Sequence, residues 1–438
     1  MKISIFGLGY VGAVSLACLS RDGHEVTGVD IDTSKLDLIS SGKSPVVEEG
    51  ILELMEEVAA SGRVSVTSDA GEAIQATELS FVCVGTPSLP NGGQDLTALK
   101  RLSKQLGEAL AAKDDSHIVV IRSTVEPGTV ESVVIPLLEE HSGKKADEDF
   151  HVCFQPEFLR EGSSIRDYDN PPMTVVGVRN DSPLESLRSI FGNLACKFIP
   201  TDIRTAETLK YACNTYHSLK ITFANEIGRI CQAIGSDSLQ VMELLCEDKQ
   251  LNISKAYLRP GFAFGGSCLP KDLRALLYLG KMHDVETPML SGVLPSNRVH
   301  VEHALKTILE RGDREIGVVG LSFKSGTDDL RESPLVDLVE RLIGKGINLR
   351  IYDPEVRVSR LIGANKAYIE NVVPHIGSLM CDSVETAIDG AGTVIVGLSG
   401  DDIVSSLVEH CVEEQFIVDL VGLDELRELG SDYVGACW

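Results

Sequence analysis

The chain has 438 residues, more than one hydrophobic core usually serves, so two or three domains are expected. Hydrophobic residues make up 43% and charged residues 24%, an ordinary globular composition that excludes extended disorder. The 65 acidic and 40 basic residues give a net charge of −25, which disfavours binding to nucleic acid and to anionic membranes.

Two further features of the sequence narrow the class of protein. No uninterrupted apolar stretch approaches the roughly 20 residues that a membrane-spanning helix needs. The 11 cysteines contain no Cys-x-x-Cys pair, so neither a disulfide framework nor a zinc site is indicated. We therefore predict a cytoplasmic protein that binds no nucleic acid, no membrane and no metal.

The first part of the chain alternates short apolar strands with helical stretches. The elements expected in chain order are the strand 2–6, the helix 13–20 and the strands 25–31, 80–84, 117–121, 151–155 and 174–178. The first three form the start of a β-α-β unit. Such alternation predicts a parallel, doubly wound sheet.

A long helical stretch connects this region to a second one. Between 203 and 245 apolar residues recur with helical periodicity and without proline, and 206–234 is expected to be one continuous helix. Strand and helix alternate again afterwards, with strands expected at 315–320, 347–352, 393–397 and 416–420. The similar layout of the two regions suggests an old duplication.

The predicted fold is α/β, with two Rossmann-like doubly wound domains joined by a long central helix and a helical dimerisation region. The expected boundaries are 1–202 for a dinucleotide-binding domain, 203–300 for the helical domain and 301–438 for a second Rossmann-like domain.

A glycine-rich turn follows the first expected strand. Residues 7–12 read Gly-Leu-Gly-Tyr-Val-Gly, a G-x-G-x-x-G run that opens a helix, as a dinucleotide site requires. Gly7 permits the tight turn, Gly9 lets a pyrophosphate approach the backbone, and Gly12 lets helix and strand pack closely. The alternative is a glycine-rich turn in an unrelated α/β fold.

Asp30 lies at the end of the second expected strand, 18 residues beyond Gly12. A carboxylate there can accept hydrogen bonds from the adenosine ribose hydroxyls and repels a 2′-phosphate. This position predicts NAD rather than NADP as the cofactor, although Lys35 lies close enough in sequence to weaken that selection.

The segment 261–272 carries a cysteine, a lysine and an aspartate behind a glycine-rich stretch, GFAFGGSCLPKD. A loop cysteine beside a cation ionises more readily, and the thiolate is the useful nucleophile. Taken alone, Cys268 would more often be a buried structural thiol, because free cysteine packs as a small hydrophobe.

A polar stripe interrupts the long helix. Lys210, Asn214, His217 and Asn225 share one face with Ile221, since their spacings are four, three, four and four residues. Either this face is solvated or it lines a cleft. The other faces already carry charged residues expected to be solvated, namely Arg204, Glu207 and Lys220.

With these residues in place, the chain resembles the UDP-glucose/GDP-mannose dehydrogenase family along essentially its whole length. The matching segments, in order, are GLGYVG (7–12), VGTP (84–87), STVEPGT (123–129), PEFLREGS (156–163), KYACN (210–214), NE (225–226), GFAFGGSCLPKD (261–272) and GLSFKSGTDDLRESP (320–334). A series of this kind is far more specific than any one segment.

The resemblance implies a four-electron oxidation of a sugar nucleotide by two NAD molecules in succession. A C6 alcohol becomes an aldehyde, Cys268 adds to it, and oxidation of the thiohemiacetal gives a thioester that water releases as the acid. Covalent addition is needed because it converts the aldehyde into a tetrahedral carbon that has a hydride to give.

The family's functional positions are carried over residue by residue. The implied catalytic residues are Thr124, Glu161, Lys210, Asn214, Cys268 and Asp272. The implied cofactor contacts, besides the three glycines, are Tyr10, Val11, Asp30, Lys35, Thr86, Thr124, Lys271 and Arg331. The implied substrate contacts are Glu161, Lys210, Asn214, His217, Asn225, Tyr257, Arg259, Phe262, Gly265 and Lys324.

Within the family, four features resemble the GDP-mannose branch: NPPMTVVG (170–177), KSPVVEEG (43–50), GANKAYIE (363–370) and the terminal Cys437-Trp438. They imply GDP-mannose as the substrate. The family resemblance implies a homodimer or higher homo-oligomer with shared active sites, joined through the long helix at about 206–234. Ala256 departs from the branch, which has a second tyrosine before Tyr257.

Three alternatives stay open. UDP-glucose could be the substrate, because the catalytic residues would be the same. The chain could be a two-electron dehydrogenase with a structural cysteine. It could also be a nucleotide-binding redox sensor that uses Cys268 as its thiol.

Overall fold

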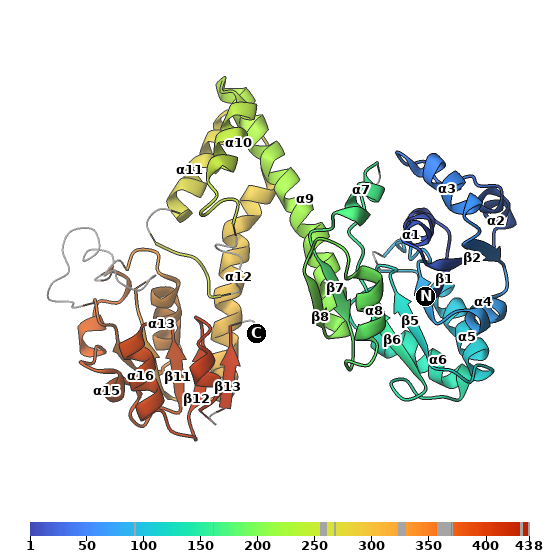
Figure 1. Ribbon diagram of the computed structural model, residues 1–438. Helices are drawn as coiled ribbons and strands as arrows, with labels where there is room; N and C mark the ends of the chain where they lie inside the picture. Colours follow the sequence, from blue (N-terminus) through green and yellow to red (C-terminus); the bar gives the residue numbers. More distant parts are fainter. Residues whose placement is uncertain are drawn as a thin grey trace. The chain divides into compact units, whose positions relative to one another are not determined.

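A computed structural model describes residues 1–91, 93–160, 162–254, 261–266, 269–322, 330–356, 369, 371–429 and 432–436, with the backbone alone for Ile221 and Asp272. The chain divides into two compact units, Met1–Ser218 and Leu219–Trp438, and each contains its own sheet (Figure 1). Both are α/β, so the predicted fold class is confirmed.

The first unit is built on an eight-stranded sheet of order β3-β2-β1-β4-β5-β6-β7-β8. Its strands are β1 (Lys2–Phe6), β2 (Glu25–Val29), β3 (Val64–Thr67), β4 (Leu79–Val82), β5 (His117–Ile121), β6 (Phe150–Phe154), β7 (Thr174–Gly177) and β8 (Phe198–Thr201). The helices that alternate with them are α1 (Tyr10–Arg21), α2 (Thr33–Ser40), α3 (Ile51–Ala60), α4 (Ala70–Ala76), α5 (Thr97–Ala111), the π-helical η1 (Val130–Val134), α6 (Ile135–Ser142), α7 (Ser164–Asp169) and α8 (Leu184–Phe191).

The helix α9 (Ile203–Ile234) begins in the first unit and ends in the second. The second unit continues with α10 (Ser238–Glu247), α11 (Leu269–Met282) and α12 (Pro288–Arg311). Its parallel sheet has the order β10-β9-β11-β12-β13. The strands are β9 (Glu315–Val319), β10 (Asn348–Tyr352), β11 (Thr393–Val396), β12 (Phe416–Asp419) and β13 (Asp432–Gly435), and the helices among them are α13 (Pro334–Gly344), η3 (Ile376–Ser378), α15 (Val384–Ile388), α16 (Asp401–His410) and α17 (Asp424–Arg427).

Two expectations about these elements were wrong. The first sheet is not wholly parallel, because β6 and β7 pair antiparallel through Phe154 and Gly177. The strands β3, β8 and β13 were also missed. All three lie at sheet edges, where exposure removes the continuous apolar run of a buried strand, and β8 contains Pro200, which edge strands tolerate.

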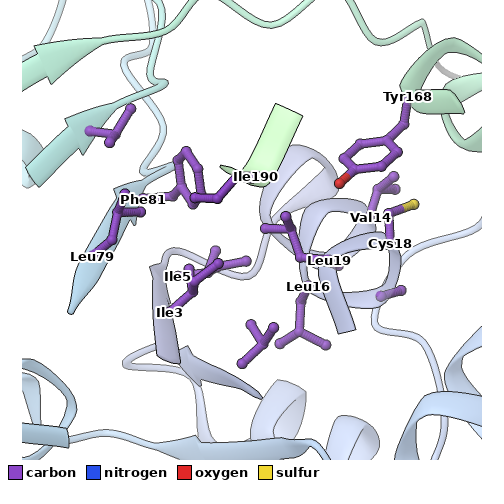
Figure 2. Packing of buried hydrophobic residues seen from close by; sticks show 14 of the residues in the cluster. Ile3, Ile5, Val14, Leu16, Cys18, Leu19, Leu79, Phe81, Tyr168 and Ile190 are labelled. Atoms are coloured by element: carbon purple, nitrogen blue, oxygen red, sulfur yellow. The ribbon is translucent and has the colours of Figure 1, made fainter. Parts of the chain in front are cut away.

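The hydrophobic core of the first unit fixes the helix that begins at the glycine-rich turn. Figure 2 shows side chains of α1, among them Leu16 and Leu19, packed toward those of β1 and β4, including Ile5 and Phe81. The approach is close because β2 has a glycine here: a Cβ at Gly28 would lie 2.7 Å from Leu16 Cδ1. The helix that starts at the turn is therefore fixed on the sheet.

No helix in the described part of the chain combines the length and the apolar character that crossing a membrane requires.

His117 in β5 gives the first unit a specific dependence on pH. Burial lowers the pKa of His117 from 6.5 to about 3, and its Nε2 lies 2.7 Å from Ser80 Oγ. Below pH 6.5 the unfolded chain binds a proton that the folded chain does not. We expect the free energy of unfolding to fall by up to about 1.4 kcal/mol per pH unit as the pH drops from 6.5 toward 3.

The measurement is urea unfolding of wild type and His117→Gln between pH 7.5 and about 4.5, following the transition that NAD stabilises. The variant should lose less stability over this range. His303→Gln, an exposed position on α12, is the matched control and should behave as wild type. Equal slopes for wild type and His117→Gln would contradict the assignment.

Candidate functional site

The glycine-rich turn has the geometry that close approach of a ligand to the backbone requires. Gly7 adopts φ +93°, and its N–H donates to Val29 O at 2.8 Å. A Cβ at Gly12 would lie 1.9 Å from Gly7 O, so only glycine fits there. Gly9 precedes the first residue of α1, and a Cβ on it would meet nothing within 4 Å. The turn is thus tightly packed at Gly7 and Gly12, whereas the space beside Gly9 is open to a ligand.

Asp30, directly after β2, is tied to this turn. Its Oδ2 accepts the Leu8 N–H at 2.7 Å and the Lys35 ammonium at 3.0 Å, and its Oδ1 accepts the Asp32 N–H at 3.0 Å. Burial alone would raise the pKa of this carboxyl, but the donors outweigh it and the pKa is lowered. Asp30 is therefore ionised at neutral pH, with Lys35 bound to it.

A cavity of about 410 Å³ lies over the turn. The cavity lies at the carboxyl edge of the sheet, and the residues that line it include Gly7, Gly9, Asp30, Lys35 and Cys83. Burial raises the pKa of Cys83 to about 11, while Arg122 lowers it and Glu157 raises it. A neutral thiol therefore faces the cavity, and Glu157 is near enough to act on it.

Two loops meet at the same edge of the sheet. Thr86, after β4, donates its hydroxyl to Thr124 O at 2.6 Å, and Gln94 donates to the same oxygen at 3.1 Å. Thr124 follows β5 and is half-buried. The structure thus brings together Thr86 and Thr124, which the sequence placed in the same site.

Lys210 of α9 is buried against Glu157, the residue that follows Pro156 after β6. Its Nζ lies 2.9 Å from Glu157 Oε1 and donates to Glu157 O at 2.6 Å. The two side chains are 9% and 12% exposed, and the ammonium lies 5.5 Å from the centre of the Phe158 ring. Sequence reasoning missed Glu157 and assigned only Glu161 from this segment, although Pro-Glu at its start was the available signal.

The rest of the polar stripe is exposed. Asn214 and His217 lie on the described surface of the first unit, and Asn225 is exposed in the second. The expectation that Glu207 is solvated was wrong. Glu207 is fully buried and accepts the N–H groups of Gly128 and Val130, at the start of η1.

In the second unit, side chains of α12 hold the stretch 261–266. The Asn297 amide accepts the Phe264 N–H at 3.0 Å and donates to Phe264 O at 2.8 Å. His300 Nε2 lies 2.6 Å from Gly261 O. The half-buried Phe262 ring lies 6.2 Å from that of His300.

The turn after Leu330 also contacts this stretch. A Cβ at Gly265 would lie 2.3 Å from Glu332 O, so glycine is needed here for packing. Arg274 of α11 pairs with Glu332 through two contacts of 2.9 and 2.5 Å. Arg331, an expected cofactor contact, is half-buried in this turn.

The structure describes only some of the remaining residues that the sequence analysis assigned to the site. Lys271 is exposed on α11, and Val11 is half-buried in α1. For Asp272 the backbone alone is described, in α11. The expected site residues outside the described part of the chain are Glu161, Tyr257, Arg259, Cys268 and Lys324, together with Ala256.

Within the described residues, no group of three or more His, Cys, Asp or Glu side chains is arranged to hold a metal ion.

Sequence models of one protein family match three successive parts of the chain. They are described as the NAD binding domain, the central domain and the UDP binding domain of the UDP-glucose/GDP-mannose dehydrogenase family, and they cover residues 1–195, 204–299 and 317–423. The chain belongs to this family. The predicted family, the NAD cofactor and the class of NAD-dependent nucleotide-sugar dehydrogenase are confirmed.

The chain is similar over its full length to characterised members. It is 48% identical to the GDP-mannose 6-dehydrogenases of Pseudomonas syringae and Pseudomonas aeruginosa, with 100% of each chain covered. It is 38% identical to the UDP-glucose 6-dehydrogenase of Haloferax volcanii, over 81% of this chain and 83% of that one. A crystal structure of a ternary complex of the Pseudomonas aeruginosa GDP-mannose dehydrogenase matches with a TM-score of 0.94, at 48% identity and full coverage of both chains.

The geometry of Asp30 generates a test of cofactor selection. Asp30→Asn removes the charge that would repel a 2′-phosphate and weakens the acceptor for the ribose hydroxyls. We expect the KM for NAD to rise about tenfold or more, as for the loss of a charge-assisted hydrogen bond, and the preference for NAD over NADP to relax.

The matched control is Asp32→Asn, two residues along. Asp32 is exposed and accepts the Ser34 N–H at the start of α2, a role that asparagine fills equally well. It should keep the wild-type preference. If instead Asp30→Asn leaves the preference unchanged, the selecting acid is not Asp30.

Proposed function

We propose that the chain is a cytoplasmic GDP-mannose 6-dehydrogenase that oxidises C6 of GDP-mannose to the acid, with two NAD consumed, through a thioester on Cys268. The observation that carries the choice of substrate is the 48% identity over the whole length to GDP-mannose 6-dehydrogenases, against 38% over a shorter length to a UDP-glucose enzyme. The product would supply an acidic exopolysaccharide such as alginate.

Lys210 is suited to stabilise negative charge on the C6 oxygen. An ammonium has three N–H donors, one of which is donated to the Glu157 carbonyl oxygen, while the Glu157 carboxylate forms an ion pair with the ammonium at 2.9 Å. A remaining donor can be directed at a substrate oxygen. Because the ammonium is buried and held in place, it needs no reorganisation as the oxygen gains charge. Asn214, one turn along α9, would hold the same oxygen.

The proposed nucleophile, Cys268, stands directly before α11 in the sequence. It comes immediately before Leu269, where the described part of α11 begins. A helix N-terminus close to Cys268 would favour the thiolate. The thiolate adds to the aldehyde carbon, and the resulting oxyanion takes up a proton to give a thiohemiacetal. NAD, when bound, would supply the hydride acceptor for both oxidations.

Proton transfer accompanies each oxidation. Glu161 would accept the proton of the C6 hydroxyl and then that of the thiohemiacetal, directly or through a water near Thr124. Asp272 would orient the water that attacks the thioester. This attack breaks the carbon–sulfur bond, releases the carboxylate and returns the thiol of Cys268.

The sugar nucleotide would be held by basic and aromatic groups. Arg259 and Lys324 would bind the diphosphate, which explains how a chain of net charge −25 takes an anionic substrate. The other proposed contacts are His217, Asn225, Tyr257, Phe262 and Gly265. Val11, Thr86, Lys271 and Arg331 stay proposed contacts of NAD.

A second copy of the chain would cover an apolar surface of the helical region. In α10 no described residue is buried, and its Leu239 and Leu244 are 82% and 65% exposed. On α11, Tyr278 and Met282 are 64% and 62% exposed. Apolar exposure on this scale marks an interaction site, which supports the proposed homodimer.

The test of the proposed activity is the amount of NADH released per sugar nucleotide. We expect two NADH for each GDP-mannose consumed and a much lower kcat/KM with UDP-glucose, because the base is recognised by a different pocket. One NADH per sugar would indicate a two-electron dehydrogenase, and a preference for UDP-glucose would reverse the substrate.

Cys268→Ser is the matching variant. It should not complete the reaction, because a hydroxyl is a far poorer nucleophile near neutral pH. Cys246→Ser, an exposed thiol on α10, should retain the full yield. Cys18 and Cys231 are buried and are poorer controls, because their replacement perturbs the core.

The shared active site is tested by mixing two inactive variants, Cys268→Ser and Arg259→Ala. If Arg259 serves the partner's site, each hybrid dimer has one intact site of two. Random pairing should then recover about a quarter of wild-type activity, since about half the dimers are hybrids. No recovery, with hybrids confirmed, would show that Arg259 serves its own chain.

A further inference from the structure

Glu48 is a buried carboxylate that the proposed mechanism does not use. It lies in the loop between α2 and α3 and is 8% exposed. Its Oε2 accepts the Gly162 N–H at 2.8 Å, and its Oε1 accepts the Ser164 N–H at 3.0 Å. Both donors belong to the backbone that continues directly from Glu161. A carboxylate that takes two N–H groups in this way makes charge-assisted hydrogen bonds, the stronger kind.

The same backbone is tied to the cofactor turn. The hydroxyl of Tyr10, the first residue of α1, accepts the Gly162 N–H at 3.1 Å. It also lies 3.5 Å from Arg160 O, to which it donates a long hydrogen bond. Residues on both sides of Glu161 are thereby attached to the helix that opens at the glycine-rich turn.

Other contacts hold the far end of this segment. Tyr168 of α7 donates to Asp22 at 3.1 Å, and Asp169 pairs with Arg21 at 2.5 Å. Figure 2 shows the Tyr168 ring beside Val14 on α1. Loss of Glu48 should therefore leave α7 docked and release mainly the stretch from Arg160 to Ser164.

We propose that Glu48 is a positioning residue for Glu161, an inference that rests on the proposed function of Glu161 as the proton acceptor. Its two backbone hydrogen bonds fix the peptide that follows Glu161, and Tyr10 ties that peptide to the cofactor turn. The backbone on both sides of Glu161 and the glycine-rich turn are then attached to one element, α1. A backbone attached in this way limits the movement of the catalytic side chain that it carries.

The test compares Glu48→Gln with Glu49→Gln in the full-length enzyme. Glutamine presents its NH₂ to one of the two N–H donors, so one hydrogen bond is lost, whereas Glu49 is the exposed neighbour in the same loop. We expect kcat of Glu48→Gln to fall about ten- to a hundredfold, as for a displaced catalytic group, with the KM for NAD unchanged. Glu49→Gln should match wild type.

An isotope effect separates positioning from simple loss of folded enzyme. With GDP-mannose deuterated at C6, the isotope effect on kcat should rise in Glu48→Gln, because the oxidation steps become slower relative to the others. If kcat falls only in proportion to the folded fraction and the isotope effect stays at the wild-type value, the proposal is overturned.

Amide hydrogen exchange tests the attachment without any turnover. Exchange in a peptide spanning 158–166 should accelerate about tenfold or more in Glu48→Gln, and not in Glu49→Gln. Unchanged exchange there would equally overturn the proposal. Failure of the proposed function shows separately, as a wild-type chain that releases no NADH.

Discussion

The ion pair between Lys210 and Glu157 is the interaction on which the site depends. It joins α9 to the loop after β6, and both groups are largely removed from water, with Nζ and Oε1 2.9 Å apart. Burying two charges is costly, and removing either partner typically costs about 3–5 kcal/mol because the other is left uncompensated. The carboxyl edge of the first sheet and the first half of α9 are therefore held in one arrangement.

Buried glutamates recur as the means of fixing this arrangement. Besides Glu157 and Glu48, Glu207 accepts the N–H groups at the start of η1, and Glu226 accepts those of Met289 and Leu290 at the start of α12. Glu207 and Glu226 are both fully buried on α9. The helix is thus attached at its first half to one unit and at its second half to the other, by carboxylates that complete helix N-termini.

The same hydrogen bond, from a leucine N–H to an aspartate carboxylate, occurs at corresponding places in the two sheets. Leu8 N–H donates to Asp30 at 2.7 Å, and Leu321 N–H donates to Asp353 at 2.8 Å. Each leucine follows a glycine of positive φ at the end of the first strand of its sheet. Asp353, however, is only 4% exposed. It also accepts hydrogen bonds from Ser322 and from the backbone N–H groups of residues 355 and 356, so its role is structural. This supports the duplication that the layout suggested.

Sequence reasoning predicted the parts of the molecule that follow from local rules. The turn at Gly7, the strand before it and the acid at Asp30 depend on short-range sterics and spacing, and they lie where expected. The edge strands β3, β8 and β13 were missed because their apolar pattern is weak. Glu207 and Glu157 were misjudged because their partners, at 128–130 and at Lys210, are distant in sequence and only the fold brings them together.

In the proposed reaction, a covalent intermediate on Cys268 links two oxidations at one site. Mass spectrometry of the intact protein after a single turnover with NAD and GDP-mannose, quenched in acid, tests it most directly, and Asp272→Asn should slow hydrolysis enough to accumulate the adduct. The account predicts a sugar-nucleotide acyl group, attached as a thioester, on the peptide that contains Cys268. The proposed covalent intermediate would be contradicted if two NADH were released per sugar while neither wild type nor Asp272→Asn showed an adduct on this peptide at any quench time.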